Sequence, residues 1–468
     1  MNENSKFYIL KSFAITASAL VGYQLTICLP FVICSIFIGR LGDEIALGAY
    51  GITLTLINVA FNGVVMGIQE AFGIIATKLY GSKKPKEIPG YFYKSIIITI
   101  GVSMIFHIFT HHSYSFLVFI GVEEIIAWPS YLLMKKASWF LYFQGINGVI
   151  NNFLSTQHIT KPLYILNVSS IFSIYLFATL FIEKLGYREI GFAYTKLCQE
   201  LFSFGFYLIL MFRYIDRSLF KLPPSNEIFH KFWSYLKFNL FTSLGFYGEF
   251  LSFEINTYYA ALLHNAVALA TWVTFVNYSV IFYFASIGFA NAMRNYLGKK
   301  LAEHKIDEAR SDSKLYFKFI GIITFIIMVL QLVFKETIAS IYTTNDRIIE
   351  QLKTNLALHI FGIYSTLTLL AFNSVYRTLG QDTLQLQINV FLYPLTIAFI
   401  SFVLCFALGL NVEGLNISLT ICKTFIVGLM AYGLYYKMEW TYIKPDDTRD
   451  ESLGEEMLSS ILDPESNK

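Results

Sequence analysis

The sequence predicts an all-α membrane protein with twelve transmembrane helices arranged as two six-helix lobes. Its 468 residues are 55% hydrophobic and only 14% charged, whereas a soluble globular domain has about 25% charged residues. Apolar runs of about 20 residues recur along nearly the whole chain, and a run of that length crosses the hydrocarbon core as a helix. Function must therefore rest on the few polar residues inside the spans, because polar groups are costly there.

Twelve apolar segments are expected to cross the membrane, with short charged connectors between them. The first has lysines before it and no small-residue cleavage site, so we expect it to be a span and not a cleaved signal peptide. The expected spans are 12–38, 48–76, 92–118, 132–156, 161–183, 190–212, 234–262, 267–293, 314–335, 352–376, 383–409 and 414–437.

Lysine and arginine residues concentrate in the connectors that follow even-numbered spans. Examples are Lys83, Lys84 and Lys86 after span 2, Arg213, Arg217 and Lys221 after span 6, and Lys299, Lys300 and Lys305 after span 8. Positively charged connectors stay in the cytoplasm, so we expect these connectors and both termini to be cytoplasmic.

Short sequence segments of the first half of the chain recur in the second half. Ala46–Ala49 and, one span later, Leu79–Lys83 are similar to Ala268–Thr271 and Tyr296–Lys300. Each echo falls at the second span of a six-span block, and such repeats are typical of transporters. The expected organisation is a cytoplasmic N-terminus 1–11, a first lobe 12–214, a cytoplasmic linker 215–233, a second lobe 234–437 and an acidic cytoplasmic tail 438–468.

Two carboxylates lie inside span 7, Glu249 and Glu254. An ionised carboxylate in a span costs at least about 2.5 kcal/mol, so it is normally paired, protonated or next to water. Burial favours the neutral form of such a group, which suits the uptake and release of a proton. The two lie about 140° apart around the helix and do not share a face. Tyr247 and Phe250 flank Glu249, and their ring faces are candidates for contact with an organic cation.

Polar residues in the first half supply the other candidates. Gln69 and Glu70 lie in span 2, and we weigh Glu70 as a coupling residue against a salt-bridge or helix-end role. In span 4, Gln144, Asn147 and Asn151 are spaced i, i+3 and i+7, near one face of the helix. They are candidates either for the lining of a substrate cavity or for hydrogen bonds between helices. Asn58 and Gln69 of span 2 are further candidates for the substrate cavity.

Several segments together resemble the signature of multidrug and toxic compound extrusion (MATE) transporters of the eukaryotic branch. The resemblance extends over about positions 10 to 437. The segments that carry it are FIGRLGDEIALGAYG (37–51) followed by Asn58, MGIQEAFGIIATKLYGSKK (66–84), FLSTQHITKP (153–162), LGYREIGFAYT (185–195), GEFLSFEI (248–255) and SVYRTLGQD (374–382).

The resemblance implies two six-helix lobes and efflux of organic cations or other xenobiotics, driven by protons or sodium ions. It favours both Glu249 and Glu254, because eukaryotic members carry an acid at each matching position. Many of those relatives also carry an acid at the position of Gly73, and Glu70 lies one turn earlier. In span 10 the acid that often precedes the family's arginine is replaced by Thr366, a candidate cavity residue, so coupling there is in doubt.

The other function classes find less support. There is no phosphate loop, nucleophile elbow or HExxH, so we expect no enzyme, cofactor, metal or nucleic-acid partner. We predict a monomeric, multi-pass antiporter in the plasma membrane or a vacuolar or other endomembrane, which exports organic cations in exchange for protons. The alternatives are a sodium-coupled exporter and a lipid-linked oligosaccharide flippase. A flippase needs a basic cavity, whereas span 7 carries acids. Buried acids and doubled lobes argue against a channel or receptor.

Overall fold

The computed structural model describes residues 3–81, 84–157, 159–215, 223–379, 382–437 and 440. Within that part the chain is helical and has no β-strand, so the predicted all-α class is confirmed. A few side chains on described helices lie outside the description, and Glu249 is one of them. The acidic tail also lies outside it, apart from Trp440.

Two compact units make up the described chain. Unit 1 contains the described residues of Met1–Glu44 and Ile255–Asp450, and unit 2 contains those of Ile45–Glu254. These boundaries differ from the six-span blocks expected from the sequence. The first long helix packs against helices of the second half, and one boundary falls within the helix that carries Glu254.

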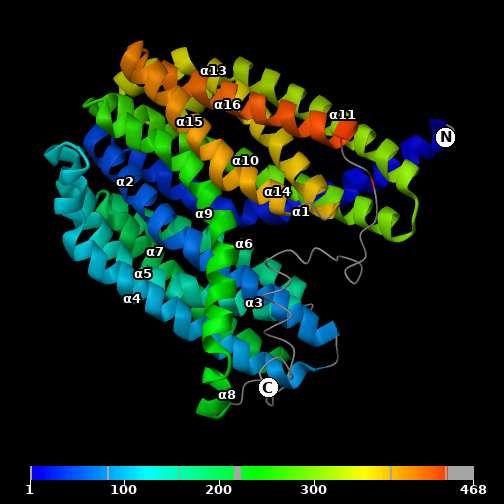
Figure 1. Ribbon diagram of the computed structural model, residues 1–468. Coiled ribbons are helices and arrows are strands. Elements are labelled where there is room, and N and C mark those ends of the chain that lie inside the picture. Colours follow the sequence, from blue (N-terminus) through cyan, green and yellow to red (C-terminus); the bar gives the residue numbers. More distant parts are fainter. Residues whose placement is uncertain are drawn as a thin grey trace. The chain divides into compact units, whose positions relative to one another are not determined.

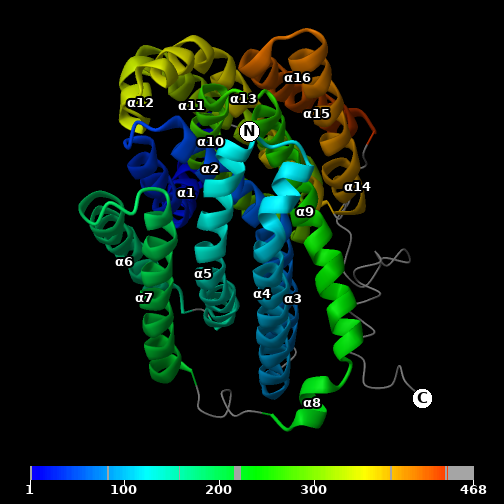
Figure 2. The same ribbon diagram turned by 90° about the vertical axis from the view of Figure 1, so that its left-hand side faces the viewer.

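Unit 2 is built mainly from helices of the first half of the chain (Figure 1). They pack in the order α6, α7, α5 and α4, and α3 lies against both α4 and α5 (Figure 2). Its elements are α2 (Glu44–Ile57, whose first residue belongs to unit 1), the π-helical turn η1 (Asn58–Asn62), α3 (Gly63–Gly81), the 3-10 turn η2 (Pro85–Glu87), α4 (Ile88–Phe119), α5 (Glu124–Thr156), α6 (Thr160–Ala178), the π-helical turn η3 (Thr179–Lys184), α7 (Ile190–Tyr214), α8 (Ser225–Phe229) and the part of α9 (Phe232–Leu262) that ends at Glu254.

Unit 1 combines the first helix with the second half of the chain. Helix α10 packs on both α1 and α13, and α13 also packs on α16. Besides the end of α9, the elements are α1 (Glu3–Gly39), α10 (Ala266–Ala302), α11 (Ile306–Val333), α12 (Lys335–Tyr342), α13 (Asp346–Thr378), α14 (Asp382–Gln387), the π-helical turn η5 (Ile388–Leu392), α15 (Tyr393–Phe402), the π-helical turn η6 (Val403–Ala407), α16 (Asn411–Tyr432) and the π-helical turn η7 (Gly433–Lys437).

Helix ends follow local signals in the sequence. Gly121 adopts a φ of 92° between α4 and α5, a backbone conformation that L side chains rarely adopt. The side chain of Asn265 accepts a hydrogen bond from the backbone of Ala268 and caps α10. Asn345 caps α13 in the same way. These breaks fall between long apolar helices, as the expected spans require.

Among the described residues, nine helices or continuous helical segments are long and apolar enough to cross a membrane, judged by length and composition. Helices α5, α7 and α9 are not among them, although they have 33, 25 and 31 residues. Each carries charged residues within its length, such as Lys135 in α5 and Lys196 in α7. Some of the polar residues that lower their hydropathy, such as Lys196, also form the polar clusters described below.

Helices α3 and α9 approach each other closely at a GxxxG sequence, Gly63 to Gly67. A Cβ atom on Gly67 would fall on the backbone of Ser243, and one on Gly63 would lie 3.3 Å from the Cα of Tyr247. Side-chain hydroxyls then reach the other helix: Ser243 donates to the Val64 carbonyl over 3.0 Å. Small residues allow such close contacts between membrane helices. The contact sets the position of α9 in unit 2 and hence that of Glu254.

We expect Gly67→Ala to lower the free energy of unfolding by about 1–3 kcal/mol, because the added methyl group must push α9 away from α3. Gly73→Ala on the same helix is the matched control, since a Cβ atom there would meet nothing within 4 Å. It gains the same helix propensity and should leave stability unchanged or raised. Unfolding of the purified protein in bicelles would measure both, and equal stabilities would show that the close contact is unimportant.

Candidate functional site

Glu254 is a buried carboxylate at the centre of a polar cluster in unit 2. Its side chain is 5% exposed. The Thr55 hydroxyl at the end of α2 donates to one carboxylate oxygen over 2.5 Å. The side-chain amide of Asn58 donates to the other oxygen over 2.7 Å. Both carboxylate oxygens therefore accept a hydrogen bond, and both donors are neutral groups.

The π-helical turn η1 extends this cluster. It interrupts the continuous helix formed by α2 and α3, and Asn58 and Asn62 are its first and last residues. The Asn62 amide donates to the Asn58 side-chain oxygen over 2.8 Å. Gln144 of α5 in turn donates to the Asn62 side-chain oxygen over 3.1 Å. Three amide side chains thus connect Glu254 to α5. Single π-helical turns are frequent at functional sites.

This network brings together three residues predicted from the sequence, Glu254, Asn58 and Gln144. Asn62 was not predicted, although an asparagine four residues after Asn58 in the same span was a visible signal. The other predicted residues of unit 2 lie at different places. Gln69 packs its amide against Gly148, and its backbone carbonyl accepts from Asn152 over 2.7 Å.

The remaining first-half and span-7 predictions are not joined to the network by any hydrogen bond among the described side chains. Glu70 is exposed on α3, without a hydrogen bond or ion pair to a described residue. Tyr247 is 36% exposed, and Phe250 is half-buried on the same helix. The side chain of Glu249 lies outside the description, so its role stays a prediction.

A second polar cluster in unit 2 joins α7 to α5. The Lys196 ammonium lies 2.9 Å from a carboxylate oxygen of Glu200, and both side chains are buried. The Asn147 amide donates to the other oxygen of Glu200 over 2.8 Å. Sequence analysis named Asn147 but missed the ion pair. The i, i+4 spacing of a lysine and a glutamate inside an apolar span was the signal that could have revealed it.

The predicted face of α5 carries three buried amide oxygens without a hydrogen-bond partner among the described residues. They belong to Gln144, Asn147 and Asn151. In Gln144 and Asn147 the nitrogen of the same amide is bonded, toward Asn62 and Glu200 respectively. A buried acceptor without a donor costs about 1–3 kcal/mol, so each such atom needs an explanation.

In unit 1, Thr366 of α13 lies next to a buried lysine. The Lys423 ammonium of α16 donates to the Thr366 hydroxyl oxygen over 2.5 Å. Lys423 is 2% exposed and Thr366 is 6% exposed. The position where relatives often have an acid therefore contacts a basic group. Sequence analysis missed Lys423, although a lysine inside the last apolar span is unusual enough to suggest a role.

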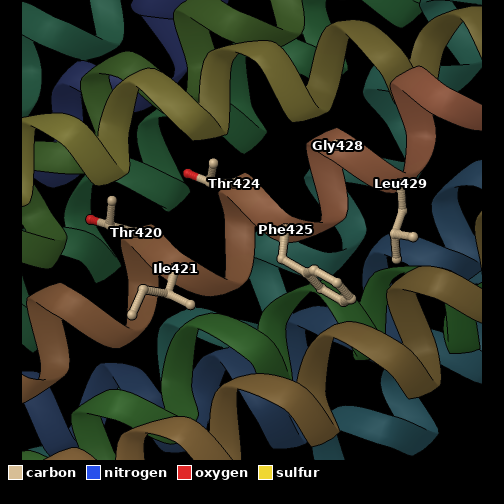
Figure 3. Close-up of a pocket in the computed structure, with 6 residues that line it drawn as sticks. All are labelled: Thr420, Ile421, Thr424, Phe425, Gly428 and Leu429. Carbon is tan, nitrogen blue, oxygen red and sulfur yellow. The ribbon is translucent and has the colours of Figure 1, made fainter.

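A groove of about 580 Å³ runs along α16 in unit 1. Its lining, shown in Figure 3, consists of Thr420, Ile421, Thr424, Phe425, Gly428 and Leu429. None of the predicted site residues lines it, and both threonine hydroxyls already have hydrogen-bond partners. Exposed apolar side chains on a membrane helix are explained by contact with lipid. The groove therefore adds no chemistry to the two clusters of unit 2.

The clusters differ in what they can do. Glu254 accepts hydrogen bonds from the neutral side chains of Thr55 and Asn58. Glu200 is already compensated by Lys196 at short range. We therefore regard Glu254 as the candidate for ion exchange and the Lys196–Glu200 pair as a charged link between α5 and α7.

Comparisons with known proteins identify the family of the chain. The family model described as MatE matches residues 19–180 and 242–403. Multidrug and toxin extrusion protein 1 of Homo sapiens is 23% identical over 444 residues, which cover 92% of this chain and 75% of the relative. Protein DETOXIFICATION 8 of Arabidopsis thaliana is 22% identical, and the alignment covers 93% of this chain and 92% of the relative.

Solved structures show the same fold. The eukaryotic MATE transporter AtDTX14 superposes with a TM-score of 0.73 at 16% identity, over 93% of this chain and 97% of that chain. An inward-facing multidrug resistance MATE transporter of the MOP superfamily gives a TM-score of 0.75 at 15% identity, over 88% and 97%. The family model covers well over half of the chain, and the relatives confirm the resemblance found in its motifs. The chain belongs to the MatE family of multidrug and toxin extrusion transporters, is of the eukaryotic type, and is a multi-pass integral membrane protein.

Proposed function

We propose that this transporter exports organic cations in exchange for protons, and that Glu254 is the group at which the two compete. The observation that carries the proposal is the buried carboxylate held by the neutral groups of Thr55 and Asn58. A proton and a cationic substrate each compensate the negative charge of such a carboxylate, so binding of one disfavours binding of the other. The names of the relatives, which refer to extrusion of drugs and toxins and to detoxification, support an exported substrate.

The exchange is electroneutral if one proton enters for each monovalent cation that leaves. The span-10 position at which relatives often carry an acid is Thr366, which supports a single exchanging carboxylate. The membrane voltage then does no work, and only the pH difference drives transport. One pH unit corresponds to about 1.4 kcal/mol, or roughly tenfold accumulation.

We expect export of a fluorescent organic cation from proteoliposomes to follow an imposed pH gradient and to respond little to a potassium–valinomycin voltage. Protein-free liposomes with the same gradients are the control. Strong voltage dependence would mean that another charge moves with the substrate. Loss of transport on removal of sodium, with the pH gradient intact, would contradict proton coupling and favour a sodium-driven exporter.

A further inference from the structure

We propose that the side-chain oxygen of Gln144 binds an N–H group of the transported cation, and that the charge of Glu254 controls this oxygen through Asn58 and Asn62. The inference rests on the proposed function in one respect, because it takes Glu254 as the group that gains and loses the proton. It adds the substrate class that the site prefers and the way in which protonation releases the substrate.

The orientation of the three amides follows from the chemistry of an ionised carboxylate, which only accepts hydrogen bonds. Asn58 must therefore turn its nitrogen to Glu254, which leaves its oxygen for Asn62. Asn62 must donate to that oxygen, and its own oxygen then accepts from Gln144. Each amide is fixed by the one before it. The last atom in this series of hydrogen-bonded amides is the side-chain oxygen of Gln144.

That oxygen is buried and has no hydrogen-bond partner among the described residues. The aligned amides polarise one another, so the negative charge of Glu254 makes the Gln144 oxygen a stronger acceptor. A second amide oxygen in a similar situation lies three residues further along α5. Glu200 holds the nitrogen of Asn147, and the Asn147 oxygen is also buried without a partner in the described chain. Two carboxylates thus each orient one unsatisfied oxygen on the same helix.

Two acceptors three residues apart on α5, each without a donor among the described residues, match a cation with several N–H groups. A guanidinium presents such donors in a fixed plane. A primary or secondary ammonium also offers N–H groups, whereas a quaternary ammonium offers none. We therefore expect the site to prefer N–H-bearing cations over quaternary cations of similar size and equal charge.

Protonation of Glu254 reverses the direction of the hydrogen bonds between the three amides. A proton from bulk water adds to one carboxylate oxygen, and the resulting O–H donates to Asn58, which turns its oxygen toward Glu254. Asn62 and Gln144 then rotate in turn, since each amide can exchange its oxygen and nitrogen without changing shape. Gln144 now presents N–H where its oxygen was, and the cation loses its acceptor. The charge of Glu254 and the polarity of the binding group change together, which couples proton uptake to substrate release.

The test compares two cations that share a benzyl group and a charge of one. Binding of benzylguanidinium and of benzyltrimethylammonium to the full-length protein in nanodiscs is measured by calorimetry at mildly alkaline pH. We expect the wild type to prefer benzylguanidinium by at least about tenfold, which corresponds to 1.4 kcal/mol. Gln144→Leu and Asn62→Leu should each bring the ratio of the two dissociation constants close to one. Asn62→Leu keeps the Gln144 side chain. Its effect therefore tests the connection between Gln144 and Glu254 and not the contact between Gln144 and the cation.

Asn152→Leu is the matched control, because it removes a hydrogen bond between α5 and α3 without touching the chain of amides. It should keep the wild-type ratio. The proposal is overturned if the wild type binds neither cation or binds both equally well. It is also overturned if Gln144→Leu and Asn62→Leu both keep the preference for benzylguanidinium. Binding is measured without any gradient, so a protein that discriminates but shows no proton-driven transport would refute the proposed coupling and leave the Gln144 site standing.

Discussion

Glu254→Gln is expected to reduce proton-driven export of an organic cation to the level of protein-free liposomes. Glutamine keeps the shape of the side chain and can still bond to Thr55 and Asn58, but it cannot take up or release a proton at neutral pH. It also has no negative charge with which to attract a cation. Transport is measured as substrate efflux driven by an imposed pH gradient, with the amount of folded protein checked by its elution profile.

Two further variants show whether the loss is specific. Glu254→Asp retains a titratable carboxylate at a shorter reach and should keep part of the activity. Glu413→Gln makes the same chemical change at an exposed position in the first turn of α16 and should leave export intact. Export by the Glu254→Gln protein at the wild-type rate would remove Glu254 from the mechanism. Glu249, the other carboxylate of α9, would then be the first residue to test.

The sequence predicts the members of the Glu254 network better than the way they meet. A carboxylate, an asparagine and a glutamine inside spans are conspicuous because polar groups are rare there. Asn58 and Asn62 are four residues apart, a spacing at which side chains also meet on an ordinary helix. The sequence does not predict the π-helical turn that contains both residues.

The division into units shows a similar limit. Hydropathy predicts where helices cross the membrane, but it does not predict which helices pair. Helix α1 belongs with α10 in unit 1, where a Cβ atom on Gly288 would collide with the backbone of Val21. The glycine that allows this approach is visible in the sequence, but its partner is not. The buried lysines were missed for a different reason. The average hydropathy of a span stays high even where the span contains a single charged residue, so the average does not reveal that residue.

The largest stability effect is expected at one of those lysines. Lys196→Met leaves the carboxylate of Glu200 buried without its cation, and removal of one partner of a buried ion pair costs about 3–5 kcal/mol. The Asn147 hydrogen bond to Glu200 remains, but it does not replace the ammonium group of Lys196. Chemical unfolding of the purified protein in bicelles would measure the loss.

A double-mutant cycle separates the ion pair from the packing around it. Replacing both residues, as in Lys196→Met with Glu200→Met, removes the buried charges together, and well-packed apolar pairs are often as stable as the ion pair they replace. The double variant should therefore be more stable than Lys196→Met alone. The exposed pair Lys305–Glu303, with a similar separation of 2.8 Å, is the matched control. Lys305→Met should change stability little, because water already solvates both of those groups. If Lys196→Met were as harmless as Lys305→Met, the buried ion pair would not contribute to stability, and other contacts would hold α5 and α7 together.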